Sequence, residues 1–293
     1  MLNQSFKEYE IIVINDGSTD GGEELVDRLY GDKVQQIHQE NQGVSVARNT
    51  GIAKASFPWI AFLDADDFWH QEYLNFVAAA IKENMEVGII GCQYDPYQLV
   101  INPQLKYIKL ENYFKKADQN VLFFTSATVL KRSFFDQKPG FDPGLKLGED
   151  IDVWIRASLF FGDGIYIQNT LVAYGQDDQN RATKKSYPLD QTLIPKLIQA
   201  EYYTKSVLKS TCSQASFEVF RDKWIYMGLF QCYALESNAQ PIGKLLKKMP
   251  NRFGLVKSFY LLPFGLLQPL FDNLSFSKLF RNYMKFCFRY IYT

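Results

Sequence analysis

Residues 59–69 read WIAFLDADDFW, an apolar run that ends abruptly in three aspartates. Residues 59–63 have the length and the continuous hydrophobicity of a strand that is buried on both faces of a parallel sheet. In open α/β sheets, ligands bind just beyond the carboxyl ends of such strands. We therefore predict that Asp64, Asp66 and Asp67 belong to a ligand site beside the core of an α/β domain.

Three carboxylates in one turn repel each other, and the repulsion is tolerable where a cation or a charged substrate balances it. Hard oxygen ligands suit Mg²⁺ or Mn²⁺, and Mg²⁺ commonly combines one or two carboxylates with the phosphates of a substrate. The turn thus indicates a metal-assisted phosphate or diphosphate site. The plainer alternative is a turn in which one Asp caps the helix starting near Glu72, but such a cap needs a single carboxylate.

Composition narrows the class of protein. The chain has 293 residues, is 47% hydrophobic and has a formal net charge of zero, so it allows one large or two small domains. Nothing in this balance favours a polyanion, and we expect no nucleic-acid partner. Four scattered cysteines and two histidines argue against a zinc site or a disulfide framework. We expect a reducing compartment, no signal peptide and no clean membrane span.

Strands and helices alternate along the first part of the chain. The predicted strands cover residues 10–15, 34–38, 59–63 and 87–92, and the helices between them cover residues 23–30, 44–54 and 72–82. This alternation predicts an α/β fold with a doubly wound, mainly parallel sheet and helices on both faces.

The pattern loosens after residue 95. We predict a strand and turn over residues 122–130, a short helix over 131–135, a helix over 148–161, a strand over 165–174, and helices over 193–209 and 217–236. The change to long helical patterns divides the chain into an α/β domain, residues 1–185, and a helical C-terminal region, residues 186–293.

Four segments together resemble one large family. They are EIIVINDGSTDGG (10–22), ENQGVSVARNTGIAKA (40–55), WIAFLDADDFW and GEDIDVWIRA (148–157). In this order and spacing they resemble the family-two inverting glycosyltransferases, which have the Rossmann-like GT-A fold and use nucleotide-diphosphate sugars. The resemblance covers about residues 1–183, and the four segments are specific only in combination.

The resemblance implies a role for each matching residue on the donor side. Asp16 would accept hydrogen bonds from the nucleotide base, Arg48 would line the nucleotide pocket, and Asp64 would lie near the ribose. Asp66 would bind the Mn²⁺ or Mg²⁺ that bridges the diphosphate, and a uridine nucleotide is the commonest donor in the family. Many relatives carry a metal-binding His where this chain has Asp177, so Asp177 either joins the metal or belongs to a flexible loop.

On the acceptor side, the resemblance implies that Asp150 is the catalytic base, with Glu149 beside it. An acceptor hydroxyl is a poor nucleophile until a carboxylate takes its proton, so the chemistry needs such a group. Each assignment has a plainer alternative. Asp16 could hold the turn that follows it, Arg48 could be a surface charge, and acids at a helix N-terminus are favoured electrostatically. Tyr174 and Trp154 are expected in the core rather than under a sugar.

The sequence departs from the family pattern at its front. The family begins with a strand, a nucleotide-contacting turn and a helix whose end resembles residues 2–6. We expect the chain as given to lack that central strand, and therefore to be less stable and poorly active.

The C-terminal residues are basic and aromatic. Residues 279–292 alternate between these two types, which suits a helix lying in a membrane interface. The alternative is a helical subdomain packed on the sheet. Because many relatives act on lipid-linked acceptors, we expect a cytoplasmic protein at the inner face of the cell membrane.

The residues and the resemblance together imply a metal-dependent, inverting glycosyltransferase that extends a cell-surface polysaccharide or a lipid-linked glycan. An apolar strand followed by D-x-D also occurs in haloacid-dehalogenase-type phosphatases, but Phe68 stands where that motif requires Thr or Val. The rival from another class is a truncated, inactive remnant that only binds a membrane or a partner.

Overall fold

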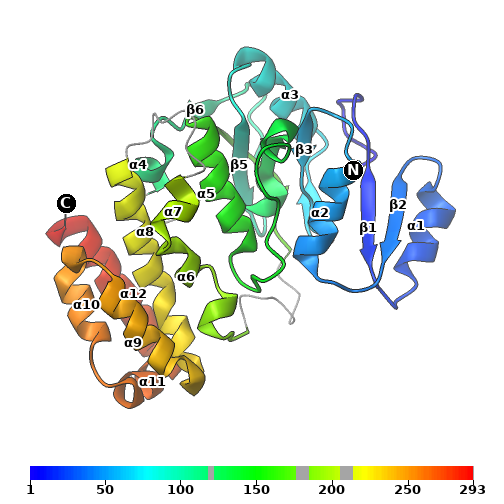
Figure 1. Ribbon diagram of the computed structural model, residues 1–293. Helices are drawn as coiled ribbons and strands as arrows, with labels where there is room; N and C mark the ends of the chain where they lie inside the picture. The colour runs from blue at the N-terminus through cyan, green and yellow to red at the C-terminus, as the bar shows by residue number, and fades with distance from the viewer. Residues whose placement is uncertain (118–121, 176–184, 205–213, 293) are drawn as a thin grey trace.

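The computed structural model describes residues 1–117, 122–175, 185–204 and 214–292. A two-stranded sheet lies at one end, a six-stranded sheet with its helices fills the middle, and a helical bundle forms the other end (Figure 1). This arrangement confirms the predicted α/β fold with a helical C-terminal extension.

The strands and helices of the α/β region follow the predicted order, with several additions. They are β1 (Ile12–Asp16), α1 (Gly22–Tyr30), β2 (Gln35–Gln39), α2 (Val44–Lys54), β3 (Trp59–Ala61), β4 (Phe68–Trp69), α3 (Tyr73–Glu83), β5 (Ile89–Asp95), β6 (Tyr107–Lys109), α4 (Tyr113–Ala117), β7 (Thr128–Lys131), α5 (Glu149–Phe161) and β8 (Ile165–Ala173). Short strands β4 and β6 and helix α4 were not predicted, because two to five residues carry too little periodicity to be recognised.

The larger sheet has the strand order β3-β7-β5-β8-β4, and β6 also pairs with β8. β5 and β8 are parallel, and β3 runs in the same direction because β3 and β5 are both antiparallel to β7. The predicted common direction therefore holds for these three strands and for the parallel pair β1–β2. β4, β6 and β7 run the other way, which makes the sheet mixed.

β1 and β2 form a sheet of their own. β1 packs on helix α2, where Gly51 faces Ile14, whereas helix α1 has no buried residue. In the described part of the chain, β1 pairs only with β2 and β3 only with β7, so each has an edge without a strand partner. That a further strand would complete this sheet stays a prediction.

The C-terminal region is a bundle that shares its core with the α/β region. Its helices are α6 (Ile194–Leu197), α7 (Ala200–Thr204), α8 (Gln214–Leu229), α9 (Ala239–Lys248), α10 (Gly254–Tyr260), α11 (Phe264–Asp272) and α12 (Leu274–Phe286). Phe114 of α4 contacts Phe217 and Phe220 of α8 at ring distances of 5.0 and 5.3 Å. The bundle therefore packs on the α/β region through aromatic side chains of α4 and α8.

The two long helices predicted here are shorter in the structure. The helix predicted over 193–209 appears as α6 and α7, and residues 205–213 lie outside the described residues. The helix predicted over 217–236 ends at Leu229 and continues as a 3₁₀ segment, Phe230–Ala234. Asn238 follows this end and donates its Nδ2 to the carbonyl of Cys232 at 2.9 Å, so a side chain satisfies a terminal backbone acceptor.

Within the described residues, no single helix is both long and apolar enough to cross a membrane. The segments Asn251–Tyr260 and Phe264–Asp272 meet that length and composition only as a pair, and the pair is bent by 82°.

Candidate active site

Arg48 joins two acidic segments that are far apart in the sequence. Its Nη2 lies 2.8 Å from Asp64 Oδ1, and its Nη1 lies 3.1 Å from Glu149 Oε1. The guanidinium also lies over the ring of Phe141, 5.2 Å from its centroid. Burial opposes the positive charge of Arg48, but Asp64 and Glu149 more than offset this cost and raise its pKa. The surface-charge alternative for Arg48 is therefore wrong.

The neighbouring Asn49 holds the loop that leads to α5. Asn49 Nδ2 donates to the carbonyl of Phe141 at 2.7 Å, and the Phe141 amide donates to Asn49 Oδ1 at 2.8 Å. A Cβ at Gly140 would lie 2.1 Å from Asn49 Oδ1, so a side chain there would displace Asn49 from these hydrogen bonds. Arg48 and Asn49 together fix helix α2 against the start of α5.

The predicted strand over residues 59–63 is shorter than expected. β3 ends at Ala61, because its partner β7 begins only at Thr128, after a 3₁₀ segment, Thr125–Ala127. The chain then turns, and the Asp64 amide donates to Ser126 Oγ at 2.9 Å. This turn places the aspartates beside residues of the 3₁₀ segment.

The three aspartates after β3 have three different environments. Asp64 binds Arg48, and Asp66 is exposed. Asp67 is 5% exposed, and its Oδ1 accepts a hydrogen bond from the Gly175 amide at 2.9 Å. Asp67 therefore connects the acidic turn to the end of β8. Burial raises the pKa of Asp67, and the nearby carboxylates of Asp66 and Asp64 add to this effect.

We expect Asp67→Asn to raise the melting temperature by a few degrees at neutral pH. A carboxyl whose pKa is raised in the folded state binds its proton more tightly there, so folding stability falls as the pH rises through that pKa. Asparagine keeps an acceptor for Gly175 without the charge. The gain should vanish below the ordinary Asp pKa of 3.8. Thermal melts of the parent chain and of Asp67→Asn, from neutral pH to below pH 3.8, test this expectation. An Asn variant that is less stable than the parent chain at neutral pH would contradict it.

Helix α5 begins with the two carboxylates that the sequence singled out. Asp150 Oδ2 accepts a hydrogen bond from Thr125 Oγ1 at 2.9 Å, and its Oδ1 accepts one from the Ile151 amide at 2.7 Å. Burial and the charge of Asp150 raise the pKa of Glu149, while Arg48 opposes them. Gly148 precedes the helix with a positive φ of 87°, a conformation that favours glycine.

Asp16 is the last residue of β1, and its carboxylate binds the turn before helix α2. Its Oδ1 accepts hydrogen bonds from Gln39 Nε2 at 2.7 Å and from the Gln42 amide at 2.9 Å, and its Oδ2 accepts one from the Gly43 amide at 2.8 Å. Asn15, rather than Asp16, accepts from the Ser18 amide and so holds the turn after β1. Asp16 thus shapes the turn before α2, and its contact with a nucleotide base stays a prediction.

The predicted metal site has one described candidate ligand, Asp66. In the described part of the chain, no group of three or more His, Cys, Asp or Glu side chains is arranged to hold a metal ion. Asp177, the second predicted metal ligand, lies outside the described residues. The exposed carboxylate of Asp66 is a donor of the right chemistry, and Mg²⁺ often takes its remaining ligands from water and substrate phosphates.

An aromatic cluster that sequence reasoning missed lies near Asp150. The ring of Phe124 lies 4.6 Å from that of Tyr94 and 4.8 Å from that of Tyr174. Burial raises the pKa of Tyr94, and the charge of Asp150 contributes to the shift. Tyr94 is 38% exposed and Tyr174 is half-buried, so the prediction of a core position for Tyr174 is wrong, whereas Trp154 is buried as predicted.

The signals for these residues were weak in the sequence. Thr125 and Ser126 stand with Thr128 among apolar residues of the run 122–130, and Tyr94 lies two residues after the strand predicted over residues 87–92. Only the contact with Asp150 and Asp64 distinguishes the hydroxyl residues from ordinary strand positions.

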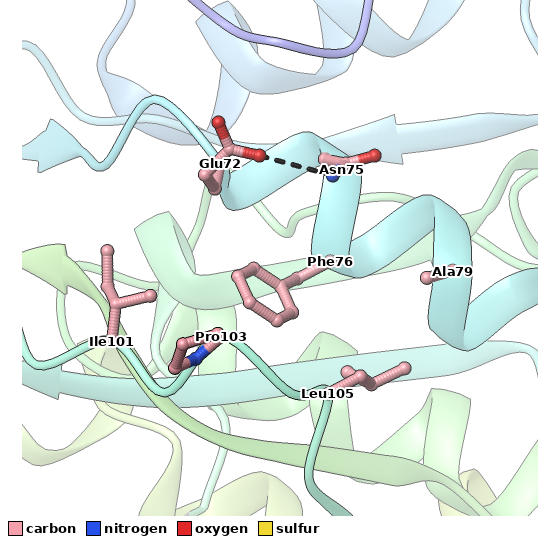
Figure 2. A pocket seen from close by; sticks show the side chains of 7 residues that line it. All are labelled: Glu72, Asn75, Phe76, Ala79, Ile101, Pro103 and Leu105. Atoms are coloured by element: carbon pink, nitrogen blue, oxygen red, sulfur yellow. Dashed lines mark hydrogen bonds between the residues drawn. The ribbon is translucent and has the colours of Figure 1, made fainter.

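A separate groove of about 360 Å³ lies between helix α3 and residues 101–105. Figure 2 shows Phe76 of α3 pointing toward Ile101 and Pro103, and Glu72 hydrogen-bonded to Asn75. None of the predicted site residues lines this groove, so the candidate site is the acidic region around Arg48.

A Rossmann-like α/β domain, an acidic turn after β3 and carboxylates at the start of α5 together define the GT-A class. The family model for glycosyl transferase family 2 matches residues 1–137. These residues therefore form a glycosyltransferase family 2 domain, as the sequence resemblance implied.

Curated relatives are described as glycosyltransferases. An uncharacterised glycosyltransferase of Rickettsia bellii is 34% identical over 166 residues, which are 54% of this chain and 23% of that protein. Glycosyltransferase GlyA of Streptococcus pneumoniae is 29% identical over 194 residues, 59% of this chain and 27% of that protein. The chain thus spans about a quarter of the length of these two relatives.

Solved structures confirm the fold. TarS of S. aureus in complex with UDP-GlcNAc has a TM-score of 0.61 and 16% identity, and the match covers 97% of this chain and 84% of that one. The mannosyltransferase PcManGT of Pyrobaculum calidifontis, in complex with GDP-Man and Mn²⁺, has a TM-score of 0.53 and 17% identity, with coverage of 97% and 78%. At this level of identity the likeness establishes the GT-A fold alone.

Proposed function

We propose that the chain transfers a sugar from a nucleotide-diphosphate donor to a hydroxyl of a glycan or a lipid-linked acceptor. The observation that carries this proposal is the double ion pair of Arg48, which brings the D-x-D turn and the start of α5 into one site. The D-x-D turn would supply the donor site, and the start of α5 would supply the catalytic base. A single displacement requires both groups within reach of one sugar.

On the donor side, Asp64 would contact the ribose and Asp66 would hold a Mn²⁺ or Mg²⁺. The bound metal would act as a Lewis acid that stabilises the charge on the leaving diphosphate. Arg48 keeps Asp64 in place, because its guanidinium contacts both oxygens of that carboxylate, at 2.8 and 3.2 Å. UDP is the donor nucleotide that we would test first, since TarS is known in complex with UDP-GlcNAc.

On the acceptor side, Asp150 would take the proton of the attacking hydroxyl. The oxygen then forms a bond to the anomeric carbon, while the bond from that carbon to the diphosphate breaks and its electron pair leaves with the diphosphate. Attack from the face opposite the leaving group inverts the anomeric centre. Thr125 orients Asp150 through its hydrogen bond, and Glu149 beside it is held by Arg48.

The aromatic cluster of Tyr94, Phe124 and Tyr174 supports an acceptor sugar in this position. Aromatic side chains beside a few placed polar groups are typical of small-molecule sites. Phe124 directly precedes Thr125, so the cluster is attached to the residue that orients the base. The working location that we propose is the cytoplasmic side of the cell membrane, where a lipid-linked acceptor would be available.

Calorimetric titration of UDP into the chain with Mn²⁺, and again with EDTA, tests the donor site. We expect Mn²⁺-dependent binding that Asp66→Ala weakens at least about tenfold, because metal affinity depends on each carboxylate near the ion. The matched control is Asp32→Ala, which changes an exposed carboxylate in the turn after α1 and should leave binding unchanged.

Binding that does not depend on Mn²⁺, or that survives Asp66→Ala, would contradict the assignment. A folded chain that binds none of UDP, GDP and dTDP would instead favour the inactive remnant.

A further inference from the structure

Helix α12 has two different apolar faces. On the first, Phe280 and Met284 are buried in the main core, and Cys287 follows in the same core at the start of a π-helical turn, Cys287–Ile291. The ring of Phe280 stacks on that of Phe259 of α10 at 4.4 Å. This face accounts for the packing of the helix on the bundle.

The second face consists of Leu279, Tyr283, Phe286 and Tyr290, which we call the apolar stripe. Steps of four, three and four residues place these side chains on one side of a helix. The rings of Phe286 and Tyr290 confirm this, because their centroids are 5.3 Å apart. Leu279 is 66% exposed, Phe286 53% and Tyr290 65%. Packing within the bundle does not explain this stripe.

A row of basic residues borders the apolar stripe. Lys278, Lys285 and Arg289 each stand one position before a stripe residue, so they lie along one flank of it, and all three are exposed. We call these three residues the basic border. The sequence has no acidic residue from Asn273 to its last residue. An exposed apolar surface that is bordered by basic side chains marks an interaction site for an anionic, amphipathic partner.

Helix α10 extends the exposed apolar surface. The Leu255 amide donates to the hydroxyl of Tyr292 at 2.6 Å, so the start of α10 lies beside the end of the apolar stripe. Leu255 itself is exposed, as are Leu261 and Leu262 near the bend between α10 and α11. Figure 1 shows α10, α11 and α12 together at the end of the molecule away from β1 and β2.

We propose that the apolar stripe and the basic border bind the surface of an anionic lipid membrane, with α12 lying among the headgroups and not across the bilayer. Aromatic and leucine side chains would enter the boundary between headgroups and acyl chains, and the basic border would contact lipid phosphates. A second copy packed symmetrically through the same surface fits less well, because that surface brings the same cations and no carboxylate to balance them. This surface of α12 lies outside the donor site, and the membrane would be a partner in addition to the donor and the acceptor of the proposed reaction.

Flotation with lipid vesicles tests the proposal on the full chain. We expect it to float with mixed phosphatidylcholine–phosphatidylglycerol vesicles and much less with phosphatidylcholine alone. The triple variant Lys278→Gln, Lys285→Gln, Arg289→Gln should lower the partition coefficient roughly 100-fold. The reason is that removing one to two basic charges weakens binding to an anionic surface by about tenfold. The double variant Phe286→Ser, Tyr290→Ser should lower it at least about tenfold.

The matched control is Leu25→Ser, Leu29→Ser, which removes two exposed apolar side chains from α1 and should float like the parent chain. Flotation independent of anionic lipid, or unchanged in both α12 variants, would overturn the proposal. A lipid-free dimer that both α12 variants dissociate would overturn it in favour of a second copy. A thermal melt of every variant shows that each is folded, and calorimetric UDP titration of the parent chain separates a failure of this surface from a failure of the donor site.

Discussion

Asp150→Asn is expected to reduce the rate of sugar transfer by roughly 10²–10⁴-fold, the usual contribution of a general base. Asparagine has nearly the same shape and still offers an oxygen to Thr125 Oγ1, which donates to Asp150 at 2.9 Å in the structure. It cannot take a proton from the acceptor hydroxyl. The fold and the donor affinity should therefore survive while turnover is lost.

The measurement is release of nucleoside diphosphate from the donor identified by calorimetry, with a glycolipid extract as acceptor. Nucleotide affinity is measured on the same protein. Two matched controls are available. Asp32→Asn changes an exposed carboxylate in the turn after α1 and should have no effect. Glu149→Gln changes the carboxylate adjacent to Asp150 and should reduce turnover less. Full turnover by Asp150→Asn, or an equal loss of nucleotide affinity, would show that Asp150 is not the base.

Arg48→Met is expected to destabilise the fold by about 3 kcal/mol, the lower end of the cost of removing one partner from a buried ion pair. Methionine fills a similar volume, but it leaves Asp64 and Glu149 facing each other without a cation. The Arg48 side chain is 12% exposed and that of Glu149 14%, whereas that of Asp64 is 36%, which is why the lower end applies. The melting temperature should fall by about 6–12 °C.

The dependence of this loss on pH identifies its cause. Burial and Asp150 already raise the pKa of Glu149 against the opposing effect of Arg48, so removing Arg48 raises it further. Because a raised carboxyl pKa lowers stability as the pH rises through it, the penalty should be larger at neutral pH than near the ordinary Glu pKa of 4.5.

Thermal melts over this pH range measure the effect. Arg48→Lys should lie between the parent and Arg48→Met, because lysine restores the charge without the two-sided geometry. Arg28→Met, at an exposed position on α1, should melt like the parent chain. A penalty that does not change with pH would mean that Arg48 acts through packing on Phe141 rather than through the two carboxylates.

Several features could be predicted from sequence because they depend on neighbours a few positions away. The order of strands and helices follows from hydrophobic period, and the acidic turn follows directly from WIAFLDADDFW. The specific combination of four segments identified the family, which the family model over residues 1–137 confirms. Asp150 and Glu149 were singled out by the resemblance of GEDIDVWIRA to a segment of that family, because their place at the start of a predicted helix alone has a plainer explanation.

The tertiary structure decided which of these residues meet. Arg48 and Glu149 are separated by 101 positions, and no local pattern predicts that one arginine binds the carboxylates of both acidic segments. The use of Asp16 to hold the turn before α2 also depends on how β1 and β2 pair. The same reason applies to α12, whose periodicity marks an amphipathic helix but does not tell which apolar residues the bundle covers. Local chemistry determined the elements and their candidate residues, whereas contacts between distant segments determined the site and the exposed face.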